Sequence, residues 1–291
     1  MSPPFRSGIV AIVGGANVGK STLLNAIIGE KIAVVSDKPQ TTRLRTLGVK
    51  HDPRGQLILM DTPGITEPRV LLERKLVKQA FDAIGEADII LLLLDATRGV
   101  GPWEDTIFER LPALHAPIVL AINKKDLAAP ARLEKVKAHA LDSFHFEQVH
   151  IISALACENL EPLEIALWEM LPEGPPYFPP DMKSSLPLPL QIGEIVREKV
   201  MALTHDEIPH ATAVSQVELE EKSGLLRVAA TLIVEHDSQK GILIGKNGRM
   251  LKLIGTQARA DIERLVHKKV FLELGVKVRE KWRRRDDLLK S

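Results

Sequence analysis

The stretch Gly14 to Ser21, GGANVGKS, decides the fold of the N-terminal part of the chain. It stands between the apolar run IVAIV and the segment TLLNAIIG, and it matches the pattern GxxxxGK[ST]. Glycines let the backbone curl so that N–H groups point at phosphate oxygens, and a helix that begins near Lys20 adds the positive end of its dipole. We therefore predict a loop that binds the phosphates of a nucleotide, with contacts from Gly14, Asn17, Val18, Gly19, Lys20, Ser21 and Thr22.

Two side chains of this loop have defined tasks in phosphate-loop proteins. Lys20 is expected to reach the β- and γ-phosphates, and the hydroxyl of Ser21 is expected to bind Mg²⁺. Continuous apolar runs follow along the chain: LILMD, DIILLLLD, PIVLAIN and VHIIS. Such runs are typical of parallel strands that are buried on both faces, and helix-length segments separate them. The pattern predicts a doubly wound α/β fold.

Two further motifs indicate guanine as the base. NKKD, from Asn123 to Asp126, follows the run PIVLAI, and the Asp126 carboxylate is able to accept from guanine N1–H and from the exocyclic amine. Adenine offers no such adjacent pair of donors. The stem of Lys124 is expected to cover the base. Ser153, Ala154 and Leu155 come at the end of the next strand, where a backbone N–H is expected near guanine O6.

The motif DTPG, from Asp61 to Gly64, lies between the phosphate loop and the base motif. Asp61 is expected to hold Mg²⁺ through water, and the Gly64 N–H to meet the γ-phosphate. The polar segment SDKPQTTRLRT precedes it, and within it Thr42 is the candidate for a second Mg²⁺ hydroxyl, with Thr41 as the alternative. Ile65 stands where many GTPases have a water-orienting Gln. Lys20, Thr42 and Gly64 are the expected catalytic residues.

A proline-rich segment separates two parts of the chain. Residues 171–189 contain seven prolines, which favour a stiff, extended linker. Beyond it the pattern changes to the order α-β-β-α-α-β, with a turn at Lys222-Ser223-Gly224 between two strands. We predict a GTP-binding domain over 1–171, a linker over 172–189 and a small α+β domain over 190–291.

The second domain contains a GxxG loop, Gly245-Lys246-Asn247-Gly248, after its strand pair. This is the arrangement of a KH domain (type II), whose loop clamps the backbone of single-stranded RNA. Ile244 is a candidate for the floor of a base groove, and Lys246 and Arg249 supply positive charge. From Lys240 to Ser291 there are 15 Lys and Arg against 6 Asp and Glu. The run KVREKWRRR adds Lys281, Trp282 and Arg283, of which the tryptophan is a candidate for base stacking.

Composition excludes several classes of protein. Cys157 is the single cysteine, so the chain has no internal disulfide, and the nine histidines have no metal-binding spacing. The longest clean apolar run, Ile89 to Leu94, is far shorter than the roughly 20 residues of a membrane span. The sequence predicts a cytoplasmic protein.

The combination of PQTTR, DTPGI and NKKD with a C-terminal KH module resembles the Era family of ribosome-assembly GTPases, and residues 8–170 resemble a translation-factor-class GTPase. The resemblance covers essentially the whole chain. It implies GTP and GDP with Mg²⁺ as ligands, the 3′ end of small-subunit ribosomal RNA as partner, and a role in maturation of the small subunit. It also implies a weak association with the inner face of the cell membrane. A monomer is expected.

Two other functions are open at this stage. A P-loop kinase of a small substrate would share the phosphate loop, but NKKD argues against it and no arginine-rich lid is present. A KH-type RNA regulator with a structural nucleotide site would share the second domain, but Lys20, Ser21 and Asp61 are all retained. Arg43 and Arg45 are not assigned as arginine fingers.

Overall fold

The structure is a computed structural model that describes residues 4–35, 45–65, 71–222 and 224–284. The chain divides into two compact units, of which the first holds most residues up to Ser185 and the second those from Leu186 onward. Each unit has its own sheet and its own hydrophobic core.

The first unit is built on a six-stranded sheet with the order β2-β3-β1-β4-β5-β6. All neighbouring strands pair in parallel except β2, which runs antiparallel to β3 at the edge. The strands are β1 (Arg6–Gly14), β2 (Thr46–Asp52), β3 (Gly55–Asp61), β4 (Ile89–Asp95), β5 (Ile118–Asn123) and β6 (Gln148–Ile151). The helices are α1 (Lys20–Ile28), α2 (Leu71–Gly85), α3 (Pro102–Phe108), α4 (Pro130–Ser143) and α5 (Leu160–Met170).

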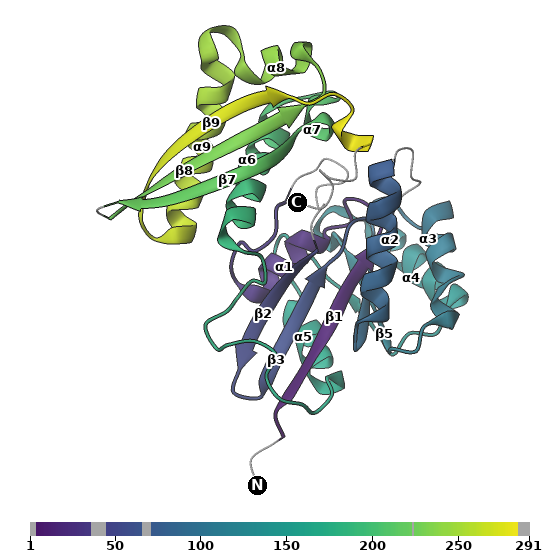
Figure 1. Cartoon of the computed structure of the whole chain (residues 1–291). Coiled ribbons are helices and arrows are strands. Elements are labelled where there is room, and N and C mark those ends of the chain that lie inside the picture. The colour runs from purple at the N-terminus through teal and green to yellow at the C-terminus, as the bar shows by residue number, and fades with distance from the viewer. Residues whose placement is uncertain (1–3, 36–44, 66–70, 223, 285–291) are drawn as a thin grey trace. The chain divides into compact units, whose positions relative to one another are not determined.

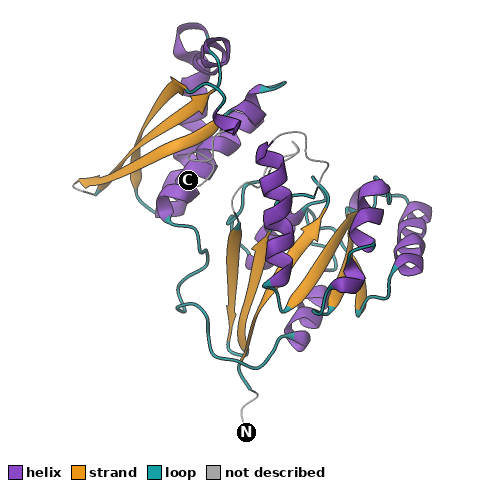
Figure 2. Ribbon diagram, turned by 45° about the vertical axis from the view of Figure 1, so that its right-hand side comes forward, coloured by secondary structure: helices purple, strands orange, loops and turns teal. Residues whose placement is uncertain are grey.

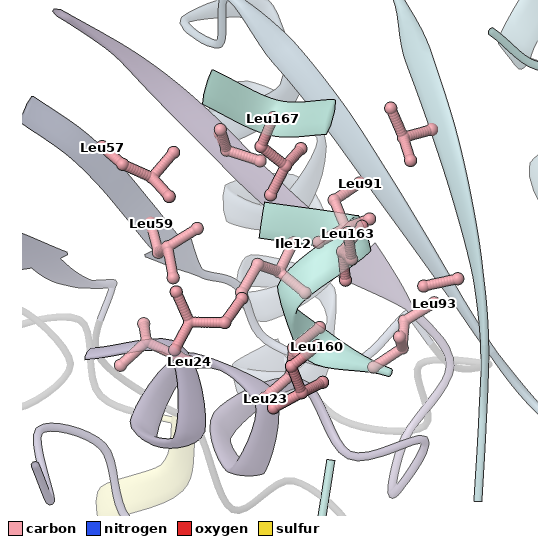
Figure 3. Packing of buried hydrophobic residues seen from close by; sticks show 14 of the residues in the cluster. Ile12, Leu23, Leu24, Leu57, Leu59, Leu91, Leu93, Leu160, Leu163 and Leu167 are labelled. Atoms are coloured by element: carbon pink, nitrogen blue, oxygen red, sulfur yellow. The ribbon is translucent and has the colours of Figure 1, made fainter. Parts of the chain in front are cut away.

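Helices cover both faces of this sheet (Figure 1). One cluster of buried residues joins the strands to α1 and α5, and a second joins them to α2, α3 and α4. In the first cluster Ile12 of β1 and Leu91 of β4 lie among Leu23, Leu24 and Leu163 (Figure 3). Strands that are buried on both faces need the continuous apolar runs seen in the sequence. The doubly wound fold is confirmed, whereas the antiparallel strand β2 was not anticipated.

The proline-rich segment is not suspended between the units but lies along the first one. It pairs with β2, because Val49 N–H donates to the Lys183 carbonyl at 3.0 Å and Ser185 N–H donates to the Leu47 carbonyl at 3.1 Å. The buried side chain of Gln56 holds an earlier part of the segment. Its amide accepts from the N–H of Tyr177 at 2.7 Å and donates to the Phe178 carbonyl at 2.6 Å.

The second unit has a three-stranded sheet with the order β7-β8-β9. β7 and β8 are antiparallel, and β8 and β9 are parallel. Its elements are α6 (Leu188–Leu203), α7 (Ile208–Ala211), β7 (Ala213–Lys222), β8 (Leu225–Val234), α8 (Asp237–Ile244), α9 (Arg249–Val266) and β9 (Lys269–Val278), and Figure 2 shows them coloured by type. The alternation in β8 buries Val228, Leu232 and Val234 against Ile254 and Ile262 of α9. The expected α-β-β-α-α-β order is confirmed.

No helix within the described residues is long and apolar enough to cross a membrane. Helix α6 begins at Leu188, with a proline in its first turn, so the last residues of the proline-rich segment already belong to a helix.

Candidate nucleotide site and RNA groove

The phosphate loop connects the end of β1 at Gly14 with the start of α1 at Lys20. Gly19 has a φ of 101°, and a Cβ at this position would lie 2.3 Å from Nδ2 of Asn123, so that no other residue fits there. Asn17 also adopts a left-handed conformation, with a φ of 63°. Val18 is buried in the core, and Thr22 is half-buried in the first turn of α1.

Lys20 is buried and folds back over this loop. Its ammonium lies 2.8 Å from the carbonyl of Gly15 and 3.2 Å from that of Gly14. Burial lowers the pKa of Lys20 to about 8, and the nearby carboxylate of Asp61 offsets this effect only in part. A group with several negative charges that bound beside Lys20 would therefore raise the pKa of this lysine back to its ordinary value.

A hydroxyl and a carboxylate suited to Mg²⁺ lie beside this lysine. The hydroxyl of Ser21, at the start of α1, donates to Oδ2 of Asp61, at the end of β3, over 2.6 Å. Both are oxygen ligands of the kind that Mg²⁺ prefers, and Mg²⁺ commonly takes one or two protein ligands beside water and substrate phosphates. Within the described residues no group of three or more His, Cys, Asp or Glu could hold a metal ion. Thr41 and Thr42 lie outside the described residues.

The DTPG motif lies against the phosphate loop. A Cβ on Gly64 would come within 2.8 Å of the Ala16 Cα, and the Ile65 N–H donates to the Gly14 carbonyl at 3.1 Å. Ile65 itself is 2% exposed and belongs to the hydrophobic core. On the outer side of the loop, Nη1 of Arg98 donates to the Ala16 carbonyl over 3.1 Å, a contact that the sequence analysis did not foresee.

Asn123 connects the phosphate loop with the base motifs. It is buried, its amide donates to the Val18 carbonyl at 2.8 Å, and its Oδ1 accepts from the Ala154 N–H at 2.9 Å. The same side chain thus ties together segments that are more than 100 residues apart in sequence. Ser153 is buried, and Leu155 is exposed.

The other residues of NKKD are half-buried or exposed. Lys124 has a φ of 65°, and its ammonium lies 2.6 Å from Oδ2 of Asp95. Burial raises the pKa of Asp95, but hydrogen bonds from Lys124 and Thr97 outweigh this effect and hold it below its usual value. Asp126 is exposed in the short turn after β5. The sequence analysis did not identify Asp95 as a site residue, although a charged residue at the end of a buried strand could have indicated it.

In the second unit the GxxG loop joins α8 to α9. Gly245 has a φ of 70°, and a Cβ there would lie 2.8 Å from the Cβ of Met250. Lys246, Asn247 and Arg249 are exposed, whereas Ile244 is half-buried. The loop leads into a groove between α9 and β9 with a volume of about 330 Å³. Its lining residues are Gly248, Leu251, Lys252, Gly255, Thr256, Arg259, Phe271, Leu272 and Leu274.

The expectation for Trp282 is corrected by the structure. The indole is 2% exposed, and its N–H donates to the Ala211 carbonyl at 2.8 Å, so the ring has no face for a base. The guanidinium of Arg283 forms an ion pair with Glu235, with Nε 2.8 Å from Oε2. Lys281 is exposed. Trp282 and Arg283 of the basic run therefore stabilise the fold of the second unit.

Both units match known families. Residues 9–124 match the family described as 50S ribosome-binding GTPase, and residues 207–283 match the KH domain. The chain is 47% identical over 291 residues to GTPase Era of Geobacter metallireducens, which covers 99% of this chain and 97% of that protein. It is 42% identical over 284 residues to GTPase Era of Carboxydothermus hydrogenoformans, with coverage of 97% and 95%.

Two crystal structures are similar over nearly the whole length. One is a variant of Aquifex aeolicus Era bound to GDP and AlF4−, with a TM-score of 0.94, 39% identity and 98% of each chain covered. The other is Era in complex with MgGDPNP and nucleotides 1506–1542 of 16S ribosomal RNA, with a TM-score of 0.93, 40% identity and 98% of each chain covered.

Proposed function

Because this chain belongs to the Era family of GTPases, we propose that it binds GTP and GDP with Mg²⁺, hydrolyses GTP, and holds the single-stranded 3′ end of small-subunit ribosomal RNA while that subunit matures. The observation that carries the nucleotide part is the double contact of Asn123 with Val18 and Ala154. It joins phosphate loop and base loop into a single site. A site that merely stabilised the fold would not need an exposed Asp126 beside it.

Each residue of the site has a task in this proposal. Lys20 binds the β- and γ-phosphates, the Gly64 N–H binds the γ-phosphate, and Asp126 binds the guanine edge. Ser21, Thr42 and Asp61 would hold Mg²⁺, which neutralises charge on the phosphates when it is bound. The N–H groups of the phosphate loop bind the remaining phosphate oxygens at the N-terminus of α1.

Hydrolysis by the protein alone is expected to be slow. The residue after Gly64 is Ile65, which is buried and has no group that could orient water. The rate should lie in the range of unassisted GTPases, roughly 10⁻⁴ to 10⁻² per second. A slow rate suits a protein that waits in one nucleotide state until its RNA complex is complete.

The RNA part is supported by the GxxG loop and by the groove that follows it. Cations stand at the loop and at the groove, whose floor is apolar. This is the combination by which KH domains hold the backbone and bases of about four unpaired nucleotides. We assign Ile244, Gly245, Lys246, Asn247, Gly248 and Arg249 to RNA binding, with Lys281 as a phosphate contact.

The domains are proposed as a GTPase domain over 1–171, a linker over 172–189 and a KH domain over 190–291. The protein is proposed to act as a monomer in the cytoplasm, with weak attachment to the inner membrane surface. Sedimentation of the pure protein with and without vesicles of anionic lipid tests both statements. Recovery of all the protein in the vesicle-free fraction would contradict the attachment.

The function is tested by titrating the full chain with GTP, GDP and ATP in Mg²⁺, and with an RNA of the 16S 3′-end sequence at fixed salt. We expect GTP and GDP to bind far more tightly than ATP, and the RNA to bind more tightly than its double-stranded form. Equal affinity for ATP and GTP would contradict the guanine site and favour a P-loop kinase. RNA binding without any GTP turnover would favour an RNA regulator.

A further inference from the structure

The groove between α9 and β9 has the chemistry of a pocket for a flat ring. Its floor is apolar, formed by Leu251, Leu272 and Leu274, and the exposed cations Lys252 and Arg259 stand at its border. The volume of about 330 Å³ lies at the lower end of the range for small-ligand sites, roughly 300–1,000 Å³. The groove therefore fits unstacked bases rather than a helix of a partner protein.

Phe271 is the aromatic side chain among the lining residues. In β9 the neighbouring Val270 and Leu272 pack into the core, whereas Phe271 is 50% exposed. β9 is the outer strand of its sheet, and Phe271 is one of the residues that line the groove between this strand and α9. A phenyl ring that keeps half of its surface in water stabilises the fold less than a buried one. Its position is better explained by a ligand that covers it.

Gly255 lies in the middle of α9 and also lines the groove. Glycine is less favourable than alanine inside a helix. Packing does not require it here, because an added Cβ would meet the Leu274 Cδ1 at an ordinary distance of 3.5 Å. Such a methyl group would lie on the groove floor. The glycine thus keeps the groove open at the expense of helix stability.

We propose that Phe271 is the platform on which one base of the bound RNA stacks, and that Gly255 leaves the space this base occupies. This rests on the proposed RNA binding and replaces the role first expected for Trp282. Lys252 and Arg259 then meet the phosphates beside the stacked base. Stacking on an aromatic ring is tolerant of base identity, so Phe271 sets affinity more than sequence preference.

The test uses the full chain and a single-stranded RNA with the sequence of the 16S 3′ end. Phe271→Ala should weaken RNA binding roughly 5- to 150-fold, the range for the loss of one base–aromatic stack. Phe271→Tyr should stay within about threefold of the unchanged protein, whereas Phe271→Leu, apolar but without a ring, should resemble Phe271→Ala. Leu253→Ala is the matched control, since Leu253 is an exposed apolar residue of α9 outside the groove lining.

The salt dependence separates stacking from charge. Phe271→Ala should leave the slope of log affinity against log salt unchanged, whereas Lys252→Ala should reduce it by about 0.7, the value for one phosphate contact on a single strand. If Phe271→Ala binds RNA within twofold of the unchanged protein while Gly248→Asp abolishes binding, the stacking role is wrong and the proposed function stands. If the unchanged protein does not bind the RNA, the proposed function itself fails.

Gly255→Ala provides a second readout that a structural role would not give. Because alanine is the better helix former and the methyl group fits, its melting temperature should be equal or higher. Its RNA affinity should nevertheless fall at least fivefold. Unchanged RNA affinity in this variant would overturn the role of Gly255, and a lower melting temperature would show that the glycine serves packing.

Discussion

The ammonium of Lys124 lies 2.6 Å from the carboxylate of Asp95. Asp95 ends β4 and Asn123 ends β5, and the two residues are direct partners in the parallel pairing. The lysine that should cover the base is therefore held in place by the neighbouring strand. Thr97 adds two hydrogen bonds to the other oxygen of the carboxylate, at 2.8 and 2.6 Å, so that the carboxylate is itself fixed.

Replacing Asp95 by Asn should weaken GTP and GDP binding about tenfold, because hydrogen bonds to charged groups are worth about 1.5–3 kcal/mol and Lys124 is in part solvated. The measurement is the dissociation constant of a fluorescent guanine nucleotide. Glu158→Gln is the matched control, since it breaks the exposed ion pair of the neighbouring Lys125. Equal losses of nucleotide affinity in both variants would mean that the removal of any nearby negative charge has this effect.

Asp126→Asn should change the base that the protein prefers. The new amide donates where the carboxylate accepted, so GTP should lose several kcal/mol of binding free energy, whereas the O2 of xanthine accepts from the amide. Competition between GTP and xanthosine triphosphate measures the change. Asp142→Asn, at an exposed position of α4, should leave the preference for GTP as it is. A variant that still prefers GTP would place the guanine edge elsewhere.

Lys20 should make the stability of the nucleotide-free protein depend on pH. Its pKa is about 8 in the fold and about 10.5 when the chain is unfolded. Between these values the unfolded chain binds a proton that the folded chain lacks, so this group makes the protein more stable as the pH rises from 8 to 10.5. Urea unfolding across this range should show the rise, and Lys20→Met should lack it. If the free energy of unfolding depended on pH in the same way for the unchanged protein and for Lys20→Met, the lowered pKa would be wrong.

RNA and GTP binding should strengthen each other. The segment with Thr42 leads directly into β2, and β2 is paired with the linker that precedes the KH domain. RNA affinity should therefore be roughly 5- to 150-fold higher with a non-hydrolysable GTP analogue than with GDP, and RNA should tighten binding of the analogue by the same factor. Gln56→Ala, which releases the linker, should reduce the factor.

Two comparisons at fixed salt make this prediction decisive. Gly248→Asp should abolish RNA binding and its effect on the nucleotide, yet leave GTP affinity unchanged. It is preferred to Gly245→Asp, because a side chain at Gly245 would collide with Met250. Identical RNA affinities with GDP and with the GTP analogue would show two independent modules on one chain.

Local patterns predicted most of the fold and selected the residues of the candidate nucleotide site. Phosphate loops and buried parallel strands depend on residues close in sequence, so GGANVGKS and the apolar runs were sufficient. The ion pair of Lys124 with Asp95 was not predictable, because it depends on which strands are neighbours. Trp282 was misjudged for a related reason. A basic run is typical of a solvated surface, and only the tertiary fold shows that its indole is bonded to Ala211.

For Phe271 the sequence indicates the orientation of the side chain but not its surroundings. The alternation of β9 indicates that this residue faces away from the core, but an alternating strand gives no sign of the groove beside it. The linker was likewise predicted as extended because of its prolines, but it bends at Tyr177 and Phe178, turns at Pro180 and Asp181, and passes into helix α6 at Leu188. Its docking depends on carbonyl groups, which proline retains, and on the N–H groups of its other residues. Amino-acid composition does not reveal which of these groups form hydrogen bonds with the first unit.

The pairing of the linker with β2 also has a consequence for where the first domain can be cut. β2 is the outer strand of its sheet, and the linker occupies the groups that such a strand otherwise offers to foreign chains. A fragment that stopped at residue 171 would expose this edge and invite aggregation or strand exchange between copies. We therefore expect the smallest self-sufficient fragment to extend to Ser185, and the linker to protect the first domain from self-association as well as to connect it to the second.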